Sequence, residues 1–286
     1  MSHRKEKSAR YPSRLGKLLA LLPAGCVLLY PLYLATRLDL KEDTYAHSSL
    51  PAVFDGLKIV YVSDIHYGTF FKNDRLDQLV ERVNALDADI ILLGGDYGED
   101  SQGALEFWQK KPAFRARIAT LCVFGNHDRT LPEENFIPIQ DAMKAAGAIP
   151  LANDVYVLEK DGHTLAFAGP DDYYNGYPDL ERLVHLSQTA DFTIFLPHTP
   201  DILPQVYQLP EGPFYQLALC GHTHGGQVAF FGYAPKPSSD YGNRYRSGWY
   251  HEEGTDILVS NGVGTSMLPV RLGARPQFHL ITLESK

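Results

Sequence analysis

Residues 219–228 read Leu-Cys-Gly-His-Thr-His-Gly-Gly-Gln-Val, which places two histidines, His222 and His224, one residue apart after a short apolar run that ends at Cys220. Side chains alternate along a strand, but a turn at Gly221 would let the two imidazoles leave in different directions and meet different ions. On its own, this pair fits a metal site and an ordinary polar loop equally well. The question is whether the ends of other strands supply further ligands.

Buried strands followed by polar residues and then helices recur along the chain. Near-continuous apolar runs at residues 57–62, 90–93 and 121–124 are typical of strands covered on both faces. Apolar residues at three- and four-residue spacing indicate a helix at 76–86 after the first run, and a helix is also expected after each of the other two. This order predicts a parallel α/β sheet in which three strand ends meet at the carboxyl edge, where ligands bind in open sheets.

The rest of the chain has shorter patterns. Residues 39–56 and 233–251 show no period, and we interpret them as a linker and a long surface loop. The mixture of aromatic and basic residues in the loop suits a lipid interface, a nucleotide ring or simple packing of the loop on its own rings. The other expected elements are helices at 105–114, 139–146 and 180–186, a hairpin of strands 155–158 and 165–168, and strands at 192–196, 257–260 and 278–283.

Polar residues with metal-binding side chains stand at these strand ends. Carboxylate, imidazole and amide oxygen ligands suit manganese, iron or zinc, and they would be too many for one ion but about right for two ions that share a bridging ligand. A single aspartate after a strand is usually a cap, and a lone histidine is usually structural, so the prediction rests on the whole constellation. Its members are Asp64, His66, Asp96, Asn126, His127, His198, His222 and His224.

In this order the residues resemble the signatures of the calcineurin-like metallophosphoesterase family. The resemblance covers roughly residues 57–283 and implies a two-sheet αββα sandwich with helices outside and metals at the carboxyl edge. The glycines at 225–226 and 262–264 are similar to those of membrane-attached bacterial phosphoesterases, a branch that includes enzymes cleaving the pyrophosphate of UDP-2,3-diacylglucosamine. The signatures are Asp64-Ile65-His66, Gly95-Asp96, Gly125-Asn126-His127-Asp128, His198 and Gly221-His222-Thr223-His224.

The resemblance implies a division of the ligands between two ions with one bridging carboxylate. Two cations would lower the pKa of a shared water, and the resulting hydroxide would attack phosphorus in line. The implied set for one ion is Asp64, His66 and His224, the set for the other is Asn126, His198 and His222, and the bridge is Asp96.

Five further residues near the motifs have implied or possible roles. The resemblance makes His127 the group that protonates the leaving oxygen or stabilises the transition-state charge, and Asp128 would either orient it or make a structural hydrogen bond. Tyr67 and Tyr97 directly follow motifs and are candidate substrate-binding residues. Arg271 is either a fork donor to a substrate phosphate or an ordinary surface arginine.

The amino end differs from the rest of the chain. Residues 18–34 carry no charge, and with their flank to residue 38 they are just long enough to cross a bilayer core of about 30 Å. Residues 1–17 hold six Lys or Arg against one Glu, which by the positive-inside rule keeps the amino end in the cytoplasm and the following domain on the outer side. A cleaved signal peptide and a helix lying on the membrane surface are the alternatives. The predicted organisation is a basic cytoplasmic tail at 1–17, a transmembrane anchor at 18–38, a linker at 39–56 and a metallophosphoesterase domain at 57–286.

Composition and motifs together predict a membrane-bound hydrolase. The net charge of −8 argues against general nucleic-acid binding, and the three distant cysteines imply no disulfide framework. We expect a two-metal hydrolase of phosphate ester or pyrophosphate bonds, acting on a lipid-linked or cell-envelope substrate and attached to membrane lipid through its amino end. The alternative is a catalytically inactive membrane-anchored binding module with the same fold, which the complete ligand set disfavours.

Overall fold

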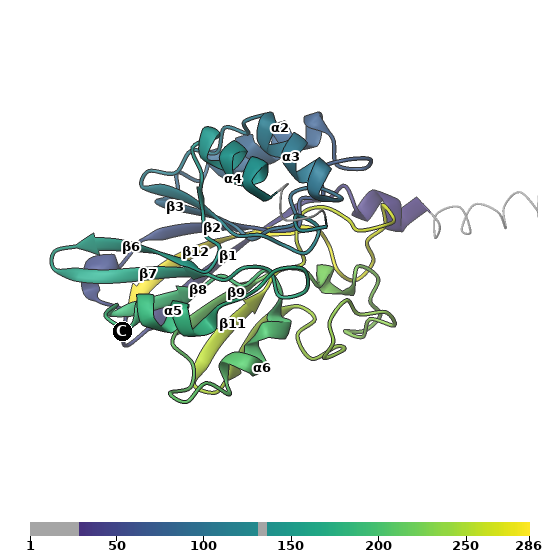
Figure 1. The fold of residues 1–286 in the computed structure, drawn as a ribbon. Coiled ribbons are helices and arrows are strands. Elements are labelled where there is room, and N and C mark those ends of the chain that lie inside the picture. Colours follow the sequence, from purple (N-terminus) through teal and green to yellow (C-terminus); the bar gives the residue numbers. More distant parts are fainter. Residues whose placement is uncertain (1–28, 131–135) are drawn as a thin grey trace, which may run out of the picture.

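The computed structural model describes residues 29–130 and 136–286, which form two mixed six-stranded sheets packed face to face with helices on the outside (Figure 1). The apolar side chains between the sheets, such as Tyr61, Phe167 and Leu219, form one core. A second core lies between the first sheet and its covering helices, and a third lies between the second sheet and its helices. The expected two-sheet α/β architecture is therefore confirmed.

The first sheet contains the three strands that begin the repeated pattern. Strands β2 (Lys58–Val62), β3 (Ile90–Leu93) and β4 (Ala119–Cys122) are neighbours and parallel, so their carboxyl ends meet at one edge as predicted. The sheet is completed by β5 (Ile149–Pro150) beside β4, and by β12 (Gln277–Ser285) and β1 (Asp39–His47) beyond β2.

The second sheet has a parallel centre and an antiparallel hairpin at each side. Its central strands are β7 (His163–Gly169), β8 (Phe192–Phe195), β9 (Leu217–Cys220) and β11 (Thr255–Val259). The predicted hairpin pairs β6 (Asp154–Lys160) with β7, and β10 (Gly248–Glu252) pairs with β11. The expected surface loop at 233–251 therefore ends in a strand.

Helices α2 (Asn73–Asn84), α3 (Ser101–Gln109) and α4 (Phe136–Ala145) cover the outer face of the first sheet, while α5 (Leu180–Ser187) and α6 (Leu203–Val206) cover the second (Figure 1). Leu76, Leu79 and Val83 of α2 are buried at three- and four-residue spacing, as the pattern predicted. Among the described residues, short 3₁₀ helices stand at Ala52–Phe54 and Pro200–Ile202, and His224–Gly226 forms a tight turn with left-handed backbone.

The predicted linker at 39–56 is wrong, because β1 pairs in parallel with β12 along its whole length from Asp39 to His47. Strand β1 is the edge strand of its sheet, and an edge strand remains stable with charged side chains on its exposed face. Tyr45 and Phe54 are buried in the core between the sheets, so the folded domain includes this segment.

The carboxyl end of the predicted anchor at 18–38 also belongs to the domain. Residues 29–34 are helical, and Leu34 and Ala35 are buried. The Arg75 guanidinium donates a hydrogen bond of 2.9 Å to the Ala35 carbonyl. Within the described part of the chain no helix has the length and apolar character needed to cross a bilayer. Most of the predicted anchor, and the whole predicted tail at 1–17, lie outside the described residues.

Candidate metal centre

Left-handed backbone at the strand ends gathers the predicted ligands. Such a conformation is uncommon outside glycine, but Asn, Asp and His adopt it more readily than other residues, and it is frequent where surrounding contacts stabilise a functional site. Backbone hydrogen bonds across the sheet edge, such as Asp64 N to the Gly95 carbonyl at 3.0 Å, hold these turns. The positive φ angles are 54° at Asp64, 47° at His66, 55° at Asp96, 67° at His222 and 52° at His224.

The expected turn at Gly221 is made by the histidines themselves, since His222 and His224 carry the positive φ angles. Gly221 is required for a different reason. A Cβ atom at Gly221 would lie 2.5 Å from Oδ2 of Asp64 and 2.7 Å from the Ser63 hydroxyl oxygen. The glycine therefore allows β9 to approach Asp64 closely, while the turns send the two imidazoles apart.

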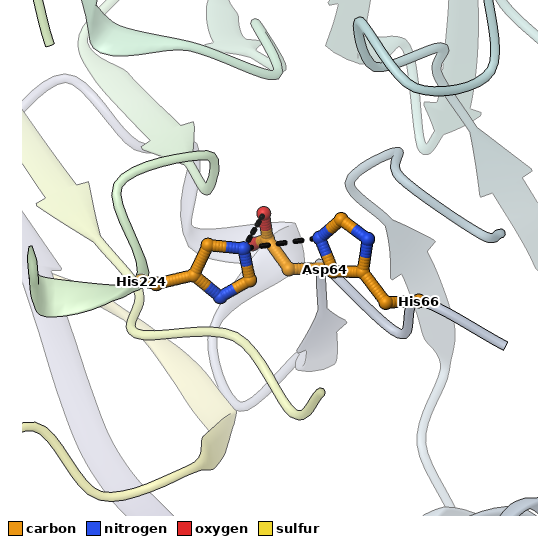
Figure 2. A group of neighbouring side chains, drawn as sticks. All are labelled: Asp64, His66 and His224. Atoms are coloured by element: carbon orange, nitrogen blue, oxygen red, sulfur yellow. Dashed lines mark hydrogen bonds and ion pairs between the residues drawn. The ribbon is translucent and has the colours of Figure 1, made fainter. Parts of the chain in front are cut away.

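Asp64, His66 and His224 form the first candidate metal-binding group, called group one (Figure 2). All three are buried, and the Nε2 atoms of His66 and His224 lie 3.0 Å apart. Nε2 of His224 is 3.7 Å from Oδ1 of Asp64. Burial lowers the pKa of His66 to about 3 and that of His224 well below its usual value. Both rings are therefore free bases, the form that binds a metal.

Asp96, His198 and His222 form group two, with Asn126 beside them. Oδ1 of Asn126 is 2.9 Å from Nδ1 of His222, and the other ring nitrogen of His222 faces the Ser238 carbonyl at 2.8 Å. Nδ1 of His198 faces the Gly94 carbonyl at 2.7 Å. These carbonyls hold a proton on the outer nitrogen of each ring, so a neutral ring would present the lone pair of its inner nitrogen to an ion.

Asp96 lies between the two groups. Its Oδ2 atom is 3.6 Å from Nε2 of His66 in group one and 3.2 Å from Nε2 of His198 in group two. One carboxylate thus faces a histidine from each group, which is the position that the resemblance implied for a bridging ligand.

The cluster fits metal ions rather than a purely structural hydrogen-bond network. Among the described residues, Oδ2 of Asp64 is buried and has no hydrogen-bond partner, and Nε2 of His198 is buried and faces the Asp96 carboxylate at 3.2 Å. Leaving such atoms unpaired is costly, and carboxylate, imidazole and amide oxygen are ligands of manganese, iron and zinc. Against the opposing effect of burial, the Asp96 and Asp64 carboxylates raise the pKa of His198 to about 10, so the cluster itself favours a positive charge.

His127 lies next to both groups without belonging to the predicted ligand sets. Its backbone N–H donates to Oδ1 of Asp96 at 2.9 Å, and its ring is 4.8 Å from the His66 ring between centroids. Nδ1 of the His127 ring lies 2.7 Å from the Glu99 carbonyl. Although burial opposes it, the Asp96 carboxylate together with this carbonyl raises the pKa of His127. These contacts favour the protonated form of the ring beside the two groups.

Asp128 could orient His127 or make structural hydrogen bonds, and its contacts are the structural kind. Its carboxylate accepts backbone hydrogen bonds of 2.8 Å from Asp96 and Gly125 and of 2.9 Å from Tyr97. It thereby ties the end of β3 to the end of β4 and fixes the position of Asp96, while the His127 ring is bound elsewhere.

Substrate binding by Tyr97 is contradicted, because this side chain is buried in the core. Its hydroxyl donates to the carbonyls of Leu93 and Val123, and its ring stacks on Phe107 at 5.5 Å. The left-handed turn at Asp96 directs the next side chain inward. Tyr67 is half-buried and donates to Asn73 at 2.7 Å, so its role in substrate binding stays a prediction.

Arg271 is neither a phosphate donor nor a surface residue. It is fully buried, and its guanidinium donates to backbone carbonyls, including those of Gly264 at 2.6 Å and Asn261 at 2.8 Å. It also donates to the His224 carbonyl at 2.6 Å and lies 3.0 Å from Nδ1 of the His224 ring. Arg271 therefore positions His224 and the turn around it.

Tyr174 was missed by the motif analysis. Its ring stacks on His222 at 5.2 Å, and its hydroxyl donates to Asp201. Asn175 donates from its side chain to the Asn126 carbonyl at 2.8 Å. The position of this segment in the sequence could have identified it. Residues 171–175 follow the carboxyl end of β7, just as the predicted ligands follow the ends of their strands.

A pocket of about 410 Å³ opens beside group one. His224 and Gln227 are among its lining residues, and Lys236 supplies a positive charge. Met267 and Leu268 give it an apolar wall. A phosphate with an apolar substituent suits this combination of charge and apolar surface.

Comparisons with known proteins agree with this geometry. The family model for calcineurin-like phosphoesterases matches residues 57–226. The chain belongs to this family, and it is a metal-dependent phosphoesterase. It is similar to the metallophosphoesterase YkuE of Bacillus subtilis, with 32% identity over 269 residues and 92% of each chain covered.

Two other relatives carry informative names. The Escherichia coli phosphodiesterase YaeI is 29% identical over 238 residues, with 79% of this chain and 82% of the relative covered. A bovine protein named as a transmembrane protein with a metallophosphoesterase domain is 29% identical over 253 residues, with 82% of this chain and 55% of the relative covered. This chain therefore matches about half of the bovine protein.

Proposed function

We propose that this phosphoesterase uses two metal ions, one in group one and one in group two, to hydrolyse a phosphate ester or pyrophosphate of a lipid-linked or cell-envelope substrate. The observation that carries the two-ion proposal is the position of Asp96, whose Oδ2 atom is 3.6 Å from a histidine of one group and 3.2 Å from a histidine of the other. A carboxylate in that place would be available to an ion in either group.

When bound, the ions would lower the pKa of a water and neutralise the phosphoryl oxygens, which supplies the nucleophile and stabilises the transition state. The chain supplies the proton. Nδ1 of His127 is held by the Glu99 carbonyl, so Nε2 of the protonated ring would be free to donate to the leaving oxygen. Asp96 fixes the His127 backbone at 2.9 Å and keeps the ring beside group one.

Support for a lipid-linked substrate comes from the amino end and the pocket. Residues 18–34 are uncharged, and one relative is named as a transmembrane protein. We place the protein at the cell membrane with a cytoplasmic amino end and an outward domain, because the basic residues precede the apolar run. An outward domain favours a lipid-linked phosphate or wall polymer over a nucleotide-linked lipid made in the cytoplasm. Protease treatment of intact cells tests this, and a protected domain would contradict the outward orientation.

Metal analysis combined with turnover of an activated aryl phosphate tests the reaction. The purified protein should contain two ions per chain and hydrolyse the aryl ester. His127→Ala should keep both ions and lose about 100-fold or more in turnover, because it removes a general acid. Asp96→Asn should lose metal as well as turnover, because it removes the charge that both groups share.

Asp161→Asn is the matched control for Asp96→Asn. Asp161 also has left-handed backbone, with φ of 51°, but it lies in the turn between β6 and β7. This control should keep both metal and turnover. Equal metal content in His127→Ala and Asp96→Asn would contradict the bridging role. A parent protein with fewer than one ion and no turnover would instead support the inactive binding module.

A further inference from the structure

Large apolar side chains project from two loops beside the metal centre. The loop at 230–233 exposes Phe231 completely, and its neighbours Phe230 and Tyr233 are 52% and 62% exposed. In the second loop Met267 is 83% and Leu268 is 61% exposed. Single exposed apolar residues are ordinary, but five in two adjacent loops form a patch of the kind that marks an interaction site.

Hydrogen bonds join these loops to each other and join the second loop to the first helix of the described chain. Ala229 N donates to the Leu272 carbonyl at 2.7 Å, and the Gln227 side chain donates to the Leu268 carbonyl at 3.1 Å. Arg271 N donates to the Pro31 carbonyl at 3.0 Å, which joins the second loop to the helix at residues 29–34. Figure 1 shows this purple helix beside the yellow loop, at the end of the molecule away from the carboxyl terminus.

The helix adds apolar side chains of its own. Leu29, Tyr30 and Tyr33 are 63%, 53% and 55% exposed. We propose that these residues and the two loops form one membrane-docking face, which rests on the headgroup and acyl boundary of a lipid bilayer and presents the pocket beside group one to amphiphilic phosphates. The residues of this docking face are Leu29, Tyr30, Tyr33, Phe230, Phe231, Tyr233, Met267 and Leu268.

A lipid bilayer is the occupant that the sequence favours. In the sequence, residues 18–34 carry no charge, and six basic residues precede that run. Three tyrosines lie among the aliphatic and phenylalanine side chains, and tyrosine is enriched where protein meets the lipid headgroups. Arg37 lies over the Tyr33 ring at 5.5 Å and Lys236 lines the pocket, so cations stand where anionic headgroups would meet the protein.

The position of the pocket gives the docking face a consequence for catalysis. Met267 and Leu268 belong both to the docking face and to the wall of the pocket, which His224 also lines. A lipid phosphate could therefore reach the metal centre without its acyl chains leaving an apolar surrounding. This substrate class rests on the proposed function, whereas the docking itself does not.

Tryptophan fluorescence in vesicles tests the docking with the full chain. We compare Phe231→Trp with Val157→Trp, reconstituted in vesicles of phosphatidylethanolamine and phosphatidylglycerol that contain bromine-labelled acyl chains. Val157 is 41% exposed and lies on β6, an edge strand of the second sheet, outside the docking face. Both variants keep Trp108 and Trp249, so the parent protein provides the background signal.

Phe231→Trp should show a blue-shifted emission that the labelled lipid quenches at least about twofold more strongly than that of Val157→Trp. Both chains carry the same amino end, so the difference reports the docking face alone. Equal quenching of the two variants would overturn the proposal. A blue shift that appears without vesicles and grows with protein concentration would also overturn it, because a second copy would then cover the face.

Polar substitution provides an independent measurement. Phe230→Ser combined with Phe231→Ser should reduce quenching of a dye attached near residue 233 by about tenfold, since two large apolar side chains no longer enter the lipid. Ile137→Ser combined with Val157→Ser is the control and should leave the quenching of the dye unchanged. Turnover of a soluble aryl phosphate should be unchanged in both. If the parent protein shows no such turnover, the proposed function fails, while the quenching result still decides the docking.

Discussion

The two metal-binding groups contain the same kinds of side chain but are held in different ways. Group one is buried throughout, and the guanidinium of Arg271 holds its His224 at both the backbone carbonyl and the ring. In group two, His222 is held by the Ser238 carbonyl and by stacking on Tyr174, which is 38% exposed. A fixed charge therefore supports one group, and surface loops support the other.

This difference shows how one turn can supply two unlike sites. Burial, together with the charge of Arg271, lowers the pKa of His224 and keeps its ring a free base. His222 is held by a loop at 238–240 that also bonds Asp201, and Asp201 in turn accepts from Tyr174. We expect group one to be rigid and group two to adjust when substrate binds.

Replacing His222 and His224 one at a time should have the largest effect on metal content and turnover. His224→Asn should remove the ion of group one, and His222→Asn should remove chiefly that of group two, because each imidazole belongs to a different group. Asparagine is chosen since it tolerates left-handed backbone. Turnover should fall by more than about 100-fold in each, because loss of a direct ligand exceeds the effect of losing its supporting partner. Metal content per chain is the measurement, and loss of both ions from each variant would contradict separate groups.

Arg271→Met should have an intermediate effect confined to group one. The change keeps the apolar stem and removes the charge and the hydrogen bonds, so metal affinity in group one should fall by about 10- to 100-fold while group two is unaffected. Competition with a fluorescent chelator measures both affinities, and circular dichroism checks the fold.

Arg129→Met is the matched control, because Arg129 is another largely buried arginine, paired with Asp171. Arg271→Lys should recover part of the affinity, since an ammonium group can still donate to the His224 carbonyl without the fork. If Arg271→Met lowers the metal affinity of both groups equally, Arg271 acts on the whole fold rather than on His224.

Tyr174→Phe should have the smallest effect. It removes the hydrogen bond to Asp201 but keeps the ring that stacks on His222, so the free energy of unfolding should fall by about 1 kcal/mol with no change in metal content. Urea denaturation measures this, with the exposed Tyr177→Phe as control. Loss of the ion from group two would show that the hydroxyl, and not the ring, positions His222.

The sequence predicts the ligand cluster because its physical basis is local. Parallel strands such as β2 and β3 end at the same edge, so Asp64 and Asp96 meet whatever the loops between them do. The partition of His222 and His224 between the two groups was implied by the family resemblance, and the structure places them in different groups. The left-handed turns were not predictable, because aspartate and histidine also occur in ordinary strands.

Residues whose role depends on packing could not be placed from sequence. The partners of Arg271 are backbone carbonyls of irregular loops, which leave no side-chain pattern. Tyr97 follows a motif but points inward because of the turn at Asp96. Strand β1 is paired along only one edge, so it tolerates charged residues. Those residues interrupt the apolar pattern that would have identified it as a strand.

The place of β12 in the first sheet determines when the protein can finish folding. Strand β12 contains almost the last residues of the chain, yet it lies between β1 and β2. During synthesis β1 therefore has no partner until residues 277–285 leave the ribosome, and pairing across such a sequence separation is slow. A ribosome that stops before Gln277 would release a chain in which β1, and the helix at 29–34 that precedes it, cannot join the sheet.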